Sequence, residues 1–297
     1  MFDSPTRGVR PIIGLLGSAY LGPSVLNNLD AAWIAPHGLH GIAIRDEQVL
    51  LISALGSDRP GASILNGVVR QPQGVMWSAD GSVAVLFSAS GNWIQRFTNL
   101  PNLPAAGQTM DLSGLPGTVS AIASDAPARR IAIGIRAETG GGVYIASDDQ
   151  SPVFRMPMMD PAALAFSSSE DILYAAERAT GQLFELRNSG SQAIPGTQNG
   201  ATDPVAIRSG EDAQGRRLLY VAGRADRVIR VYDAASYALL NELALETAPV
   251  GLEPLGDTSF LIAARAKDGD ALWLLSGKPA AAVYFVPSPS GSLGGQQ

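Results

Sequence analysis

Short apolar runs alternate with polar turns along almost the whole chain. The clearest stretch is Leu218–Leu245, which contains three apolar segments joined by a polar loop and a tight turn. A further apolar segment, Pro204–Arg208, comes just before it. Together the four segments predict a four-stranded antiparallel meander. No segment sustains the period of an α-helix, which argues against helical solenoids and α/β folds.

The same order of strands and turns recurs six times. First strands are expected near residues 30, 72, 118, 161, 203 and 248, so successive units begin 42 to 46 residues apart. Repeats of this length are typical of propeller blades. We therefore predict an all-β fold, a six-bladed β-propeller of four-stranded antiparallel blades, with residues 1–286 as a single domain. The Pro-, Ser-, Gly- and Gln-rich residues 287–297 are predicted to form a flexible tail.

One repeat resembles a known family. The segment Tyr220–Arg224 followed by Val228–Asp233 is similar to YVTN and NHL repeats, in which an apolar strand ends in a polar loop and the next strand ends in Asp. The chain departs from that pattern at Gly223, where Asn or Asp is commoner. The resemblance covers the chain as weak repeats with one good copy. It implies a propeller and no particular activity.

The first 29 residues precede the first full repeat. Phe2–Ile13 aligns with Tyr232–Leu243, the end of a third strand plus a fourth strand. An open ring leaves unpaired strand edges, so pairing between the two ends of the chain is expected. We predict that residues 9–14 add to the last blade as a fifth strand, or pair with a neighbouring copy. Residues 15–29 would then cross to the first blade.

Composition narrows the function classes. The net charge is −6, with 21 basic and 27 acidic residues, which argues against nucleic acid as a partner. The absence of cysteine excludes disulfides, thiolate metal sites and cysteine nucleophiles. No apolar run is long enough to span a membrane. The start of the chain, Met1–Pro5, lacks the features of a signal peptide, so the chain is either cytoplasmic, or secreted or periplasmic with its leader removed.

Five of the six predicted second strands end in an arginine. Rotational repetition would place these side chains in an arc on one face, beside the connections between blades, where they could clamp a carboxylate or phosphate. The predicted ligand-binding residues are Arg45, Arg136, Arg178, Arg224 and Arg265. A structural role is the stronger alternative, because each arginine has an acidic residue within three positions and neighbouring loops could pair them.

Catalytic and metal chemistry has little support. His37 and His40 flank a Pro-x-Gly turn without a nearby carboxylate cluster, which favours a role in the turn over a zinc site. Arg208 and Glu253 are the only charged residues in the predicted channel-lining strands, too few for a divalent metal. No GxSxG motif indicates a serine nucleophile. We therefore predict no metal and no cofactor.

The predicted function is that of a non-enzymatic binding or scaffold module for a protein or a small anionic ligand. Two alternatives stay open at this point. One is a propeller-type hydrolase, lactonase or lyase, which would need carboxylates in the channel. The other is a subunit of a homo-oligomer that assembles by exchange of the N-terminal strand.

Overall fold

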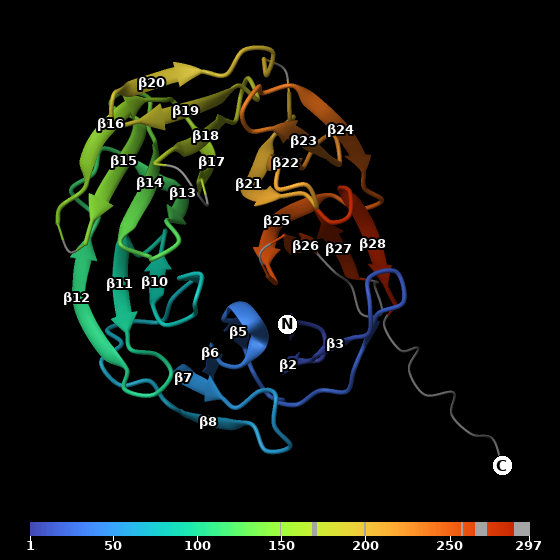
Figure 1. Cartoon of the computed structure of the whole chain (residues 1–297). Coiled ribbons are helices and arrows are strands. Elements are labelled where there is room, and N and C mark those ends of the chain that lie inside the picture. Colours follow the sequence, from blue (N-terminus) through green and yellow to red (C-terminus); the bar gives the residue numbers. More distant parts are fainter. Residues whose placement is uncertain (149, 168–170, 199, 257, 265–271, 288–297) are drawn as a thin grey trace.

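A computed structural model describes residues 1–148, 150–167, 171–198, 200–256, 258–264 and 272–287. Its strands form six four-stranded antiparallel sheets arranged in a ring (Figure 1). The predicted six-bladed β-propeller is confirmed. No helix in these ranges has the length and apolarity that a membrane crossing requires.

Each of the first three blades is an antiparallel meander in sequence order. Blade 1 contains β5 (Ala31–Ile34), β6 (Gly41–Arg45), β7 (Gln48–Ser53) and β8 (Gly61–Ile64), with a short 3₁₀ turn, η1 (Pro36–Gly38), after its first strand. Blade 2 contains β9 (Gly74–Trp77), β10 (Ala84–Ser88), β11 (Trp93–Thr98) and β12 (Ala105–Asp111). Blade 3 contains β13 (Thr118–Ser124), β14 (Arg130–Arg136), β15 (Gly142–Ser147) and β16 (Val153–Pro157).

The last three blades repeat the same order. Blade 4 contains β17 (Pro161–Phe166), β18 (Leu173–Glu177), β19 (Leu183–Arg187) and β20 (Gly190–Ala193). Blade 5 contains β21 (Pro204–Glu211), β22 (Arg217–Gly223), β23 (Val228–Asp233) and β24 (Leu239–Ala244). Blade 6 contains β25 (Pro249–Pro254), β26 (Ser259–Ala264), β27 (Leu272–Ser276) and β28 (Ala282–Val286).

The first strands share a local irregularity in blades 4 to 6. Each of β17, β21 and β25 starts with a proline, and the pairing register shifts at the next residue. The proline needs no ladder hydrogen bond at a strand start, and the following bulge lets the chain turn from the blade connection into the sheet. These three blades therefore begin with the same backbone geometry.

The core is divided among the junctions between blades. A separate cluster of buried apolar side chains fills each junction from blade 1–2 to blade 5–6. Second strands are apolar on both faces because each face packs against a neighbouring blade or the N-terminal segment. In β14, Ile131 and Ile133 pack with blade 2, and Ala132 packs with blade 4. Gly134 has no room for a side chain, since a Cβ there would lie 2.8 Å from the Cβ of Pro161 in blade 4.

The N-terminal segment does not form the predicted fifth strand of blade 6. β1 (Phe2–Asp3) pairs with β2 (Gly8–Val9), and β3 (Ile12–Ile13) pairs with β4 (Tyr20–Leu21), which makes two short hairpins. Among the described strands, β28 pairs only with β27. Pro11 offers no backbone N–H for a longer strand, and Gly14, at φ +113°, reverses the chain. The prediction of a fifth strand is therefore wrong, while pairing with another copy stays a prediction.

The same segment occupies the gap between blades 6 and 1 (Figure 1). On one side Val9, Phe2 and Leu26 pack with residues of blade 1. On the other side Ala19 and Ile12 pack with residues of blade 6. Two apolar clusters thus replace the single one found at the other junctions. The ring is closed by packing against the N-terminal segment.

Candidate functional site

Three of the predicted arginines form a row across blades 3, 4 and 5. Arg136, Arg178 and Arg224 lie at or just after the ends of second strands. Beside them, Asp160 and Asp203 immediately precede the first strands of blades 4 and 5. Arg178 lies between the two carboxylates, with its Nε 3.0 Å from Oδ2 of Asp160 and its Nη1 2.5 Å from Oδ1 of Asp203.

The other two arginines continue the alternation of charge. Nη1 of Arg136 is 3.9 Å from Oδ2 of Asp160, and Nη2 of Arg224 is 2.6 Å from Oδ2 of Asp203. Backbone bonds fix the register, because the N–H groups of Arg178 and Arg224 donate to the carbonyls of Asp160 and Asp203, each at 3.0 Å. This Arg–Asp row joins neighbouring blades and neutralises most of its own charge.

The acidic partners differ from those that the sequence suggested. Acidic residues within the arginine loops were expected as partners, yet Asp226 binds Arg230 of its own blade at 2.5 Å. The partners come instead from the residue before each first strand. The dipeptides Asp160-Pro161 and Asp203-Pro204 carried this signal, because they stand at equivalent places in two repeats.

Arg45 lies outside the Arg–Asp row. Its Nε and Nη2 donate to the backbone carbonyls of Asn28 and Asn27, at 3.2 and 3.0 Å. The acidic residue before the first strand of blade 1, Asp30, binds Arg7 of the N-terminal segment. Arg265, the fifth predicted ligand-binding residue, lies outside the described residues.

The row ends in a hollow at the junction of blades 5 and 6. Arg224, Thr247, Ala248 and Val250 line it, and its volume is about 400 Å³. The hollow lies on the side of Arg224 toward blade 6. Among the residues that the structure describes, no carboxylate lines it, in contrast to the positions that Asp160 and Asp203 occupy at the preceding junctions.

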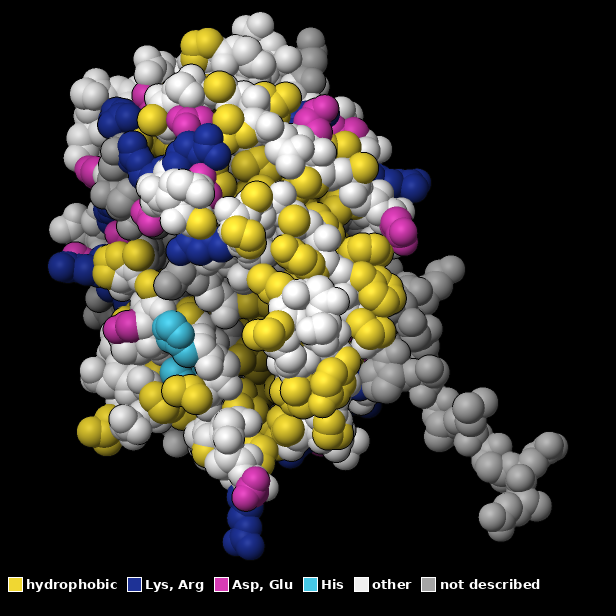
Figure 2. Space-filling model, turned by 45° about the vertical axis from the view of Figure 1, so that its right-hand side comes forward, with side chains coloured by type: hydrophobic (Ala, Val, Ile, Leu, Met, Phe, Trp, Pro, Cys, Tyr) yellow, Lys and Arg dark blue, Asp and Glu magenta, His cyan; other side chains and the backbone are white. Residues whose placement is uncertain are grey.

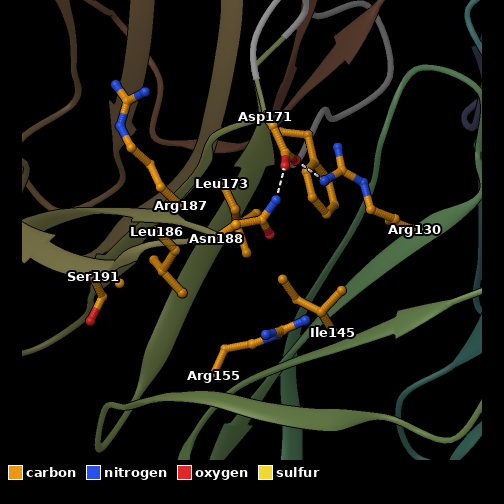
Figure 3. Close-up of a pocket in the computed structure, with 11 residues that line it drawn as sticks. Arg130, Ile145, Arg155, Asp171, Leu173, Leu186, Arg187, Asn188 and Ser191 are labelled. Atoms are coloured by element: carbon orange, nitrogen blue, oxygen red, sulfur yellow. Dashed lines mark hydrogen bonds and ion pairs between the residues drawn. The ribbon is translucent and has the colours of Figure 1, made fainter.

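A second hollow, of about 110 Å³, lies between blades 3 and 4 (Figure 3). Arg130 and Asn188 both point toward Asp171, and Arg155 extends beside Ile145 (Figure 3). Arg130 also binds Asp125, Nε to Oδ2 at 2.9 Å, and lies 4.9 Å from the ring centre of Phe166. The hollow is smaller than ordinary ligand pockets. Its charges mainly connect the two blades.

The two histidines have structural positions. His37 is exposed within η1, at φ +70°, which supports the predicted role in a turn. His40 is buried; its Nε2 is 2.9 Å from the carbonyl oxygen of Gly81 in blade 2, and its ring meets Trp77 edge-on. Within the described residues, no group of three or more His, Asp or Glu side chains could hold a metal ion.

The channel-lining strands bring Arg208 and Glu253 to equivalent positions of blades 5 and 6, each four residues after the strand's first proline. Burial raises the pKa of Glu253, and the nearby positive charge of Arg208 limits that rise. Burial likewise lowers the pKa of Arg208, against the attraction of Glu253. The pair supplies one carboxylate, whereas a divalent metal needs several oxygen ligands.

These features define a six-bladed β-propeller whose blades are joined by apolar clusters and by ion pairs. No protein-family model and no curated protein matches the chain. Solved structures show the same fold at low sequence identity. A functionally unknown protein from Desulfotomaculum acetoxidans superposes with a TM-score of 0.64 at 12% identity, over 96% of this chain and 98% of that one.

Two further structures share the fold. A chain in a nidogen/laminin complex gives a TM-score of 0.57 at 12% identity, over 80% of this chain and 90% of that one. The structure of U3-55K gives 0.55 at 15% identity, over 75% and 67%. At such identities the likeness concerns the fold alone.

Proposed function

We propose that this propeller is a non-catalytic binding module for a protein partner, which docks where the β3–β4 hairpin meets blade 6. The observation that carries the proposal is an exposed apolar surface, called here the hairpin patch. Its members are exposed by 38% to 80% of their surface: Ile13, Leu15, Leu16 and Tyr20. Exposed apolar patches on soluble proteins commonly mark interaction sites.

The hairpin and the outer strand of blade 6 form one continuous surface. A Cβ at Gly17 would lie 3.8 Å from Cδ1 of Tyr284, and the N–H of Leu21 donates to the carbonyl of Pro287 at 3.4 Å. Hydrophobic side chains gather on the right-hand side of the molecule in Figure 2, with most charged ones to the upper left. A partner can therefore bury apolar area there without desolvating charges.

The outer strand β28 adds a second means of recognition. It is an edge strand made only of apolar and aromatic residues, whereas the outer strands β16 and β24 carry Arg155 and Glu242, and β8 and β20 are rich in small and polar residues. An apolar edge without charges is a template for pairing with another strand. The likeness to a chain of a nidogen/laminin complex, itself a protein–protein assembly, and the YVTN/NHL-like repeat agree with such a module.

The test compares two charge insertions on exposed apolar residues. Tyr20→Glu places a carboxylate in the hairpin patch, at a residue 51% exposed, while Leu103→Glu, at a residue 78% exposed in blade 2, is the matched control. Tagged wild-type and variant proteins are incubated with extract of the source organism, and retained proteins are identified. The candidate partner is then purified and titrated. We expect Tyr20→Glu to weaken its binding at least about tenfold and Leu103→Glu to leave it unchanged.

Light scattering of the same three proteins tests the second candidate, self-association, which the uncharged edge of β28 also favours. A dimer that only Tyr20→Glu dissociates would identify a second copy as the partner. Equal binding and equal mass for all three proteins would overturn the proposal.

A further inference from the structure

We infer a binding site for a carboxylate group at the junction of blades 5 and 6, formed by Arg224, Thr247 and Ala248. The site shares no residue with the hairpin patch and does not depend on the proposed docking function. It arises because the repeat supplies an arginine at this junction but omits the carboxylate that receives it at the preceding one.

The missing carboxylate follows from a comparison of equivalent positions at the junctions between blades 4 and 5 and between blades 5 and 6. Arg178 binds the aspartate before the first strand of its own blade, Asp160, and the one before the next blade, Asp203. Rotation by one blade makes Asp203 and Ala248 the corresponding partners of Arg224. Ala248 precedes Pro249, and the same register shift follows as after Pro204. The strand pairing is therefore alike, and within the described residues an alanine stands where the preceding junction has an aspartate.

The hydrogen bonds of Arg224 show the consequence. Its Nε and Nη2 both contact the single atom Oδ2 of Asp203. Among the described residues its Nη1 has no partner, whereas Nη1 of Arg178 binds the aspartate of the next blade. The side chain of Arg224 is 44% exposed against 32% for Arg178. The hollow of about 400 Å³ is lined by both Arg224 and Ala248, the residue that stands in place of the aspartate.

The preceding junction also indicates the ligand. The group that completes the arrangement there is the carboxylate of Asp203, so a carboxylate is the best occupant of the hollow. Asp203 already neutralises part of the charge of Arg224, which favours a monoanion over a doubly charged phosphate. Thr247 offers a hydroxyl, and Val250, 40% exposed, offers an apolar contact. A short-chain organic carboxylate, or an acidic group of a peptide, fits this combination.

The test follows the ¹⁵Nε–H resonance of Arg224 in the full-length protein during titration with sodium butyrate, with sodium chloride as the ionic-strength control. We expect a shift that saturates in the millimolar range with butyrate and is absent with chloride. A peptide amide with a single Asp, titrated in parallel, distinguishes a free carboxylate from a peptide side chain by which probe saturates at lower concentration.

Two variants decide the assignment. Ala248→Asp places the missing carboxylate in the hollow, and we expect it to abolish the butyrate shift and raise Tm by about 1–2 °C. Arg45→Gln removes an arginine at the equivalent loop of blade 1 and should leave the shift unchanged. A butyrate shift that persists in Ala248→Asp, or one that chloride reproduces, would overturn the inference whatever the outcome at the hairpin patch.

Discussion

The junction between blades 4 and 5 and the closure between blades 6 and 1 hold the ring together in different ways. At the 4–5 junction one apolar cluster is flanked by polar contacts on both faces, Arg178 with Asp203 on one and Tyr237 with Glu185 on the other. At the closure, the N-terminal segment lies between the blades and packs against each. Residues of the repeats themselves form the contacts between neighbouring blades. The closure between blades 6 and 1 depends on the N-terminal segment, which lies outside the repeats.

This difference concentrates the stability of the closure in a few buried groups. Arg10 is 8% exposed and donates to the carbonyls of Gly22 and Leu21, at 2.8 and 3.2 Å, and to Oδ2 of Asp3 at 3.1 Å. It therefore connects both hairpins of the segment. At the 4–5 junction, by contrast, the loss of one polar contact leaves another on the opposite face.

The largest expected effect is that of Arg10→Ala. The change leaves the carboxylate of Asp3, whose side chain is 12% exposed, without its cation and two backbone carbonyls without their donor. Removing one partner of a buried ion pair costs about 3–5 kcal/mol. We expect this loss in the free energy of unfolding, measured by urea denaturation.

Arg7→Ala is the matched control for that experiment. Arg7 also joins the segment to blade 1, but the exposed fractions of Arg7 and its partner Asp30 are 56% and 44%. Exposed pairs contribute less than about 1 kcal/mol. Equal losses for the two variants would mean that the closure does not depend on the buried arginine.

The comparison also separates what the sequence can and cannot predict. The alternation of apolar runs and turns predicts the blades, because the buried strands are made of apolar residues and the turns between them of polar ones. First strands were expected near 30, 72 and 203 and begin at 31, 74 and 204. The N-terminal segment has no second copy in the chain, so alignment to the repeat suggested a fifth strand where Pro11 and Gly14 direct two hairpins.

The candidate site divides in the same way. Repetition predicts that Arg136, Arg178 and Arg224 share a face, since they follow equivalent strands. Repetition does not identify the partners of these arginines, because Asp160 and Asp203 are distant from them in sequence and come from the connections between blades. The vacancy at Ala248 becomes visible only when the junctions are compared in space. Arg45 shows that equivalent positions in the repeat can have different neighbours.

An intermediate effect is expected for Glu185→Gln at the 4–5 junction. Glu185 is 4% exposed and accepts hydrogen bonds from Tyr237 of blade 5, from Gln192, and from Arg187 at 3.3 Å. Burial alone would raise its pKa, but the hydrogen bonds from Tyr237, Arg187 and Gln192 outweigh burial and lower it. The variant should lose about 2 kcal/mol at pH 7, measured by urea denaturation.

The pH dependence of that loss tests its cause. Because the folded-state pKa is depressed, the stabilisation is present above the unfolded value of about 4.3 and is lost as pH falls through the folded value. The difference between wild type and Glu185→Gln should therefore be constant from neutral pH down to about pH 5 and shrink below about pH 4. Glu242→Gln, at a side chain 51% exposed, is the control with little effect. A difference that does not change with pH would attribute the loss to packing.

The smallest expected effect is the coupling between Arg178 and Asp203 on the opposite face of the same junction. Both side chains are partly exposed, 32% and 24%, so solvent weakens their attraction. A double-mutant cycle with Arg178→Gln and Asp203→Asn should give a coupling of about 0.5–1 kcal/mol that falls as salt is raised. A coupling near zero would mean that the apolar cluster and Glu185 hold blades 4 and 5 together without this ion pair. It would also make Arg178 dispensable there, although its contacts join the two blades in the structure.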